Sequence, residues 1–268
     1  MRAAGIVAVA VFRESVRDKV FYNLVLFALL LVGASIVIGQ LTAGQDVKII
    51  KDLGLSATSV FGVFVAIFVG ISLVSKEVDR RSVYPLLAKP IRRSELIAGK
   101  YAGLLLTLLV NVVVMTVALY AVLFFLSRGV PENIQHAWDA PALDPALLKA
   151  IALIYVDLAV VTAVALFFSS YSSPMLSAVF TLGVYVAGQF SADLKRFDQI
   201  VTAPAAVMAA KAAYYVLPDF SRFDVKLAAV HGVPITGLYM AVSILYALAY
   251  IGALLFGAMT IFARRDFK

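Results

Sequence analysis

The sequence predicts an all-α membrane protein in which six transmembrane helices follow an N-terminal helix at the membrane interface. Hydrophobic residues make up 63% of the 268 residues and charged residues only 15%, whereas about a quarter of an ordinary soluble domain is charged. A soluble fold of this size cannot bury so much apolar surface. The charged residues also gather between long apolar segments, so the net charge of +7 points to membrane topology and not to nucleic-acid binding.

Six apolar segments reach the length of about 18 residues that a membrane-spanning helix requires. The fourth and fifth come from residues 150–192, an apolar stretch about twice as long as one crossing, which a Ser-rich turn at 169–174 divides. Within a single domain covering 1–268, the predicted spans are residues 20–39, 53–75, 101–127, 148–169, 174–191 and 237–262.

The distribution of basic residues predicts that both termini lie in the cytoplasm. With six spans, 14 of the 23 Lys and Arg residues lie on the cytoplasmic side and 9 outside, as the positive-inside rule requires. A seventh span at 200–217 would carry Lys211 into the bilayer, at a cost of about 2.5–3.5 kcal/mol, and Pro204 would interrupt its helix. We therefore expect 200–217 to form a partly buried or interfacial helix within an outer segment, residues 192–236.

Residues 5–20 predict an amphipathic helix that lies at the membrane interface before the first span. At 100° per residue, one stripe of this helix is apolar and the opposite stripe is charged. The apolar stripe consists of Val9, Phe12, Val16 and Val20, and the charged stripe of Arg13, Glu14, Arg17 and Asp18. A longer first span is the alternative, but it would place these four charges at membrane depth.

A loop of 25 residues, 76–100, joins the second and third spans, although a helical hairpin needs only a few residues. A short helix ending near Ala88 is expected, because Pro90 disfavours helix at the residue before it. Ser94 is a suitable N-cap for the next span, and Glu95 would face the positive end of that helix dipole. Four apolar side chains of the loop need burial beneath the bundle or in a partner protein: Val83, Tyr84, Leu86 and Leu87.

The motifs of catalysis and cofactor binding are absent from the sequence. The chain has no cysteine, which excludes disulfides, thiolate metal ligands and a cysteine nucleophile. Its Gly-Lys pair, Gly99-Lys100, is followed by Tyr101 and lacks the earlier glycine of a phosphate-binding loop. The two histidines, His136 and His231, lie far outside any metal-ligand spacing. We therefore expect neither catalysis nor a cofactor or metal in this chain.

Asp157 is an ionisable residue near the middle of a predicted span, and with Asn111 it forms a candidate intramembrane polar site. One interpretation is a proton site. The other is a carboxyl group that stays neutral or hydrogen-bonded within the bundle, and it is favoured because a single carboxylate without a partner makes a weak proton pathway.

The segment 77–100 resembles the cytoplasmic signature of ABC-2 type transporter permeases. In that family an acidic residue precedes a Leu-Leu-x-x-Pro segment, a basic residue and a Gly-Lys pair that opens the third span. The matching residues here are Glu77, Leu86-Leu87, Pro90, Arg92 or Arg93, and Gly99-Lys100, while Arg81-Ser82 departs from the Gly-Thr of many members. The run Leu217-Pro218-Asp219-Phe220 resembles the nitrous-oxide-reductase maturation (NosY-like) branch.

The resemblance implies a non-catalytic permease subunit of an ATP-binding cassette exporter in a prokaryotic plasma membrane. Residues 5–20 would be its elbow helix, and the 76–100 loop would contain a coupling helix seated in a separate ATP-binding subunit, which binds ATP and Mg²⁺. Two permeases, as a homodimer, would pair with two such subunits. The coupling residues implied are Glu77, Arg80, Arg81, Tyr84, Leu86, Leu87 and Arg92.

Other functions remain open at this stage. The apolar interior favours an apolar or amphipathic cargo, and a complex that transmits force without bulk transport is a close variant. A proton-coupled secondary transporter would use Asp157 and would need no partner ATPase. An intramembrane enzyme is the least favoured, because its motifs are missing.

Overall fold

The computed structural model describes residues 2–40, 46–79, 93–131, 135, 138, 140–196 and 204–264. Within these ranges every regular element is a helix, so the predicted all-α class is confirmed. The elements are α1 (Arg2–Val16), α2 (Lys19–Gln40), α3 (Asp46–Asp79), α5 (Arg93–Gly129), α7 (Ala146–Ser169), α8 (Pro174–Gln189), α9 (Ser191–Lys195), α10 (Pro204–Val216), the 3₁₀ helix η2 (Phe220–Phe223), α11 (Lys226–Val230) and α12 (Gly237–Arg264).

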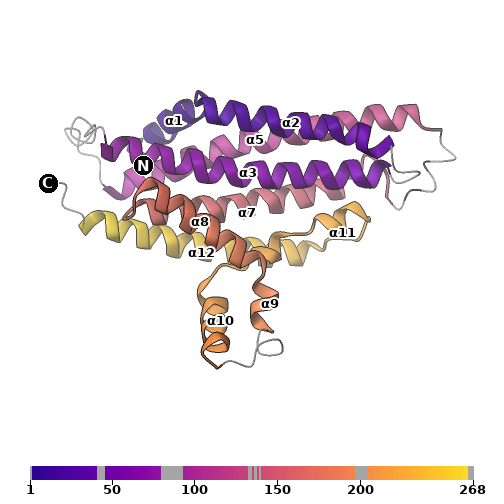
Figure 1. Cartoon of the computed structure of the whole chain (residues 1–268). Helices are drawn as coiled ribbons and strands as arrows, with labels where there is room; N and C mark the ends of the chain where they lie inside the picture. Colours follow the sequence, from indigo (N-terminus) through magenta and orange to yellow (C-terminus); the bar gives the residue numbers. More distant parts are fainter. Residues whose placement is uncertain are drawn as a thin grey trace.

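Five helices of the described chain are long and apolar enough to cross a membrane. They lie in α2, α3, α5, α7 and α12, which run side by side along one axis (Figure 1). The start of α1 and the end of α12 lie at the same end of this bundle (Figure 1). The chain is therefore a multi-pass membrane protein.

The helix α8 occupies the place of the span predicted at 174–191, but it has only 16 residues. At 1.5 Å per residue it is about 24 Å long, shorter than the roughly 30 Å of a bilayer's hydrocarbon core. Beyond it, α9 and α10 project away from the bundle (Figure 1). This apolar helix is therefore shorter than the five candidate spans, and the crossing predicted at 174–191 stays a prediction.

Several helices begin earlier than their apolar segments, because helical hydrogen bonding continues through charged turns outside the apolar run. The helix α3 begins at Asp46 and not at residue 53, and α5 begins at Arg93 and not at residue 101. The interfacial helix is also separate from the first span: α1 ends at Val16, and the Asp18 carboxylate accepts a 2.9 Å hydrogen bond from the Val20 N–H at the start of α2.

The face of α1 that is buried differs from the predicted apolar stripe. Val7, Ala8 and Val11 are buried, whereas Val9 is 46% exposed. The helix packs chiefly on α5 through the face of Val7, Ala8 and Val11. The predicted contact of the apolar stripe with the membrane interface stays a prediction.

The outer segment packs into the bundle over residues 218–230. Phe220 and Phe223 of η2 are only 1% and 2% exposed, and η2 lies against α7 and α8. A Cβ atom added at Gly188 would collide with the Pro218 carbonyl oxygen and the Phe220 ring. This segment therefore covers α7 beyond the point where α8 ends.

Three tyrosine hydroxyls of α12 hold the same segment through its main chain. The Tyr239 hydroxyl donates to the Arg222 carbonyl oxygen at 2.6 Å, and the Tyr246 hydroxyl accepts from the Asp219 N–H at 2.9 Å. The Tyr250 hydroxyl donates to the carbonyl oxygen of Val216. We call these three residues the tyrosine clasp.

Candidate functional site

Most of the predicted coupling residues lie outside the described part of the chain. These are Arg80, Arg81, Tyr84, Leu86, Leu87 and Arg92, together with the short helix expected to end near Ala88. Glu77 lies on the last turns of α3, but its side chain is also outside the described atoms. The flanking helices are described: α3 ends at Asp79 and α5 begins at Arg93, at the end of the bundle where α1 starts (Figure 1).

The first turns of α5 make close backbone contact with α1. A Cβ atom at Gly99 would lie 2.7 Å from the Val7 Cβ and 2.8 Å from the Ala4 carbonyl oxygen. A Cβ atom at Gly103 would lie 2.6 Å from the Ala8 carbonyl oxygen. Only glycine fits at both positions, so the Gly99-Lys100 pair of the signature lies at a helix crossing.

The same turns of α5 also contact α7 and α3. The Tyr101 hydroxyl donates to the Ala159 carbonyl oxygen of α7 at 3.1 Å, and the Tyr155 hydroxyl of α7 donates to the Leu105 carbonyl oxygen at 3.1 Å. The side chain of Leu104 faces Gly70 of α3. The helix that follows the 80–92 loop is thus bound to three neighbours within its first turns.

Asp157 lies on α7 and is only 4% exposed. Its Oδ1 atom has no hydrogen-bond partner among the described residues. The charged groups that act on it are Lys226 and Asp224, which pair with each other at 3.6 Å between Nζ and Oδ1. Asp157 is therefore a buried carboxyl group beneath an ion pair of the outer segment.

Polar side chains of α3 and α8 lie near this carboxyl group. The Tyr185 hydroxyl of α8 lies near the side chains of Ser59, Gln189 and Asp157. Ser59 is 3% exposed. The helices α3, α7 and α8 and the outer segment therefore contribute to one polar cluster, whose buried members are Ser59 and Asp157.

Asn111, the other residue of the predicted polar site, lies at a different level of the bundle. It is buried on α5, and its Oδ1 atom is unpartnered among the described residues. The hydrogen bonds of Tyr155 to Leu105 and of Tyr120 to Asp144 fix the antiparallel register of α5 and α7. This register separates Asn111 from Asp157 by about 10 Å along the helix axes, so the structure does not bring the two side chains together.

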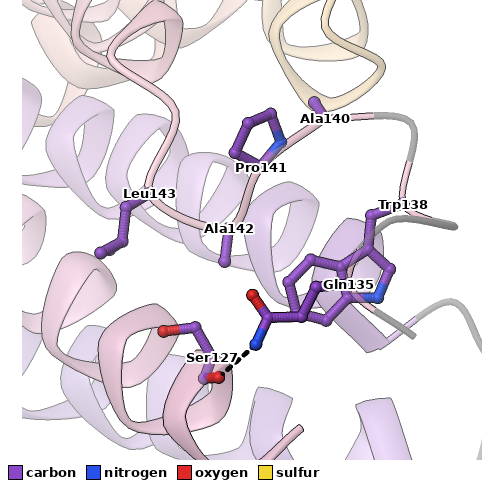
Figure 2. A pocket seen from close by; sticks show the side chains of 7 residues that line it. All are labelled: Ser127, Gln135, Trp138, Ala140, Pro141, Ala142 and Leu143. Carbon is purple, nitrogen blue, oxygen red and sulfur yellow. Dashed lines mark hydrogen bonds between the residues drawn. The ribbon is translucent and has the colours of Figure 1, made fainter. Parts of the chain in front are cut away.

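A cavity of about 450 Å³ lies at the C-terminal end of α5 (Figure 2). The Gln135 Nε2 donates to the carbonyl oxygens of Ser127 and Val130, at 2.7 Å each, which caps the last turn of α5. Figure 2 shows the Gln135 amide turned toward Ser127. The lining residues are Ser127, Gln135, Trp138, Ala140, Pro141, Ala142 and Leu143, none of them ionisable.

The sequence matches the family model of the ABC-2 family transporter protein over residues 6–267. The chain belongs to the ABC-2 transporter family. Among curated proteins, none matches this sequence. The similarity to the NosY-like branch is not tested by the family match and stays a prediction.

An ABC-2 permease is a transmembrane, non-catalytic component of an ABC transporter, and family membership implies association with an ATP-binding cassette subunit. Because the Gly99-Lys100 pair of the signature coincides with the crossing of α1 and α5, the motif has a packing reason in this ABC-2 permease. The spacing Gly99-x-x-x-Gly103 is the sequence signal that indicates such a close crossing.

Lys51 is a second feature of this ABC-2 permease that the sequence analysis missed. Its side chain is fully buried, and its Nζ donates to the Pro141 carbonyl oxygen at 2.7 Å. The sequence feature that could have predicted this contact is a lysine in the second turn of a long helix, close to a membrane surface. There an ammonium group can reach a carbonyl oxygen of a neighbouring loop.

Proposed function

We propose that the chain is the permease subunit of an ATP-driven exporter, and that a separate ATP-binding subunit docks on the loop between α3 and α5. ATP and Mg²⁺ bind to that partner and not to this chain. The observation that carries the proposal is the family match over residues 6–267. The proposed coupling interface consists of Glu77, Arg80, Arg81, Tyr84, Leu86, Leu87 and Arg92.

The arrangement of the flanking helices supports this coupling role. The loop joins α3 and α5, which have 34 and 37 residues and run the length of the bundle. A displacement of the loop acts on both helices at once, and packed helices transmit such a displacement as rigid bodies. The apolar Leu86 and Leu87, in an otherwise charged loop, suit a contact buried by a partner protein.

The remaining parts of the proposal concern assembly and cargo. The permease works as a homodimer, with both termini on the cytoplasmic side of a prokaryotic plasma membrane, and it exports an apolar or amphipathic compound. The common position of the start of α1 and the end of α12 (Figure 1) and the excess of basic residues predicted on that side support this orientation.

Co-purification tests the partner. We expect a soluble ATPase to co-purify with the wild-type chain in mild detergent, and to be lost in the double variant Leu86→Asp/Leu87→Asp, because the variant buries charge in the contact. The variant Leu143→Asp is the control, because Leu143 is an exposed residue at the other end of the bundle. An ATPase that remains bound and fully stimulated by the double variant would contradict the coupling assignment.

Cysteine labelling tests the orientation, because the chain has no cysteine of its own. A cysteine replacing Ser127 is expected to react with an impermeant maleimide in intact cells. A cysteine replacing Ser82 is expected to react only after permeabilisation. The opposite pattern would reverse the topology.

A proton-coupled secondary transporter is the second candidate, and the buried, unpartnered Oδ1 atom of Asp157 favours it. That function predicts transport driven by a proton gradient, without a partner ATPase, and lost in Asp157→Asn. Transport that continues in Asp157→Asn and depends on ATP rejects it.

A further inference from the structure

We propose that Gly99 and Gly103 join α1 and the first turns of α5 into one rigid unit, so that α1 moves with α5 and passes this movement to the start of α2. The inference rests on the proposed function, because it takes the loop before α5 as the place where the ATPase acts. It assigns Gly99 and Gly103 as positioning residues, and it makes α1 part of the moving element.

The contact between the two helices leaves no room for side-chain adjustment. At Gly99 and Gly103 an added Cβ would come within 2.8 Å of main-chain carbonyl oxygens of α1, those of Ala4 and Ala8. Contacts this short make something shift, and backbone cannot move aside as a flexible side chain can. Two helices that touch through their backbones therefore keep one relative position.

The spacing of the contact residues extends this contact over a full turn of each helix. Gly99 and Gly103 are four residues apart, so they lie on one face of α5. Their partners on α1 recur at the same helical spacing: Ala4, Val7, Ala8 and Val11. Contact at two successive turns resists rotation of one helix about the other, which a single contact point does not.

Among the glycines of the described helices, Gly99 and Gly103 are the ones that closely approach the backbone of another helix. Gly54 and Gly62 of α3 approach leucine side chains, and Gly188 approaches the Pro218 carbonyl oxygen, which lies outside the helices. Gly129, near the end of the same helix, and Gly33 of α2 have no atom within 4 Å of an added Cβ. Gly70 of α3 has only ordinary van der Waals contacts, at 3.7 Å or more. Backbone contact between helices is therefore concentrated where α5 follows the loop.

Within the described part of the chain, α1 makes few contacts with helices other than α5. It packs chiefly on α5 and only weakly on α2 and α3, and the opposite side of α1 exposes Ile6 by 72%. Its C-terminal end runs directly into α2 through the turn capped by Asp18. A shift of α5 therefore carries α1, and α1 then pulls on the first turn of α2.

Spin-label distances in the complex of the permease with its ATPase, in lipid nanodiscs, test the rigid unit. Because the chain has no cysteine, labels can be placed in pairs on exposed residues: Ile6 of α1 with Leu106 of α5, and Ile6 with Leu248 of α12. Between the nucleotide-free and nucleotide-trapped states, we expect the Ile6–Leu106 distance to change by less than about 2 Å, and the Ile6–Leu248 distance by more.

The variant Gly103→Leu breaks the unit, since even its Cβ would collide with α1. We expect its Ile6–Leu106 distance to lengthen and to become nucleotide-dependent, while the ATPase still co-purifies. Gly129→Leu on the same helix is the matched control and is expected to behave as wild type.

The outcomes separate this inference from the proposed function. If no ATPase co-purifies with the wild-type chain, both fail. If the complex forms but the wild-type Ile6–Leu106 distance changes as much as the Ile6–Leu248 distance, or if Gly103→Leu behaves as wild type, the inference alone is overturned. The wild-type distances decide the matter even where Gly103→Leu does not fold.

Discussion

The ammonium group of Lys51 donates a 2.7 Å hydrogen bond to the carbonyl oxygen of Pro141, ninety positions along the chain. The bond ties the N-terminal end of α3 to the segment that leads into α7. The Lys51 side chain is fully buried, whereas Pro141 is exposed.

We expect Lys51→Met to destabilise the protein by about 1–3 kcal/mol, because it removes a hydrogen bond that a buried ammonium group donates. Lys149→Met is the matched control: Lys149 also donates to a carbonyl oxygen, that of Ile235 at 3.0 Å, but its side chain is exposed, so water can take its place. Thermal unfolding in detergent would compare the two. Equal losses of stability in the two variants would show that burial of the lysine side chain does not determine the cost of its removal.

The close approach of the outer segment to α8 predicts that Gly188→Ala is destabilising by about 1–3 kcal/mol, as for overpacking in a core. The added Cβ would meet the Pro218 carbonyl oxygen, which belongs to the main chain, and the Phe220 ring. Gly183→Ala on the same helix has no atom within 4 Å of the new Cβ, and it is expected to be neutral or stabilising. Melting temperatures of the two variants check this, and a stable Gly188→Ala protein would contradict the packing of the segment.

If the tyrosine clasp holds the outer segment, removing its hydroxyl groups one after another should progressively weaken the protection of that segment's amides against hydrogen exchange. Tyr246→Phe keeps the ring and removes only the hydroxyl that accepts from the Asp219 N–H, at an expected cost of about 0.5–1.5 kcal/mol. Hydrogen exchange of residues 216–223 is therefore expected to accelerate in Tyr246→Phe and further in the double variant with Tyr239→Phe. Tyr22→Phe on the exposed face of α2 serves as the control. Unchanged exchange in the double variant would show that the clasp does not hold the segment.

The variant Asp157→Asn tests whether the Asp157 carboxyl group has a structural role or serves as a proton site. Its Oδ1 atom already lacks a partner, so Asp157→Asn removes no hydrogen bond at that atom, and the free energy of unfolding is expected to change by less than about 1 kcal/mol. ATP hydrolysis by the complex is expected to persist in the same variant. A collapse of stability would show that Asp157 is ionised and paired in the folded protein.

The sequence was sufficient for the class of the fold, because long uncharged segments leave few alternatives to membrane-spanning helices. Hydrophobicity did not show that α8 ends at Gln189, since residues 190–192 continue its apolar composition. It also did not show which face of α1 packs on the protein: contact with Gly99 and Gly103 places Val7 and Val11 against α5.

The candidate site was predictable only in part. A carboxyl group at the middle of an apolar segment is visible in the sequence, and Asp157 is indeed buried. The charged pair near it, Lys226 and Asp224, comes from the outer segment, about seventy residues further along the chain, and only the folded chain brings it to α7. The separation of Asn111 from Asp157 likewise depends on the register of two helices, which tyrosine hydroxyls and main-chain oxygens fix.

The hydroxyl groups of the tyrosine clasp form their hydrogen bonds with main-chain atoms of the segment: two carbonyl oxygens and one N–H group. Every residue type supplies a carbonyl oxygen, and every type except proline supplies an N–H group. Substitutions at residues 216, 219 and 222 can therefore accumulate during evolution without breaking these contacts, whereas Tyr239, Tyr246 and Tyr250 have no such freedom. Among diverging relatives, we thus expect the sequence of the outer segment to vary. Its position on the bundle is expected to stay the same, because the three tyrosines of α12 are retained.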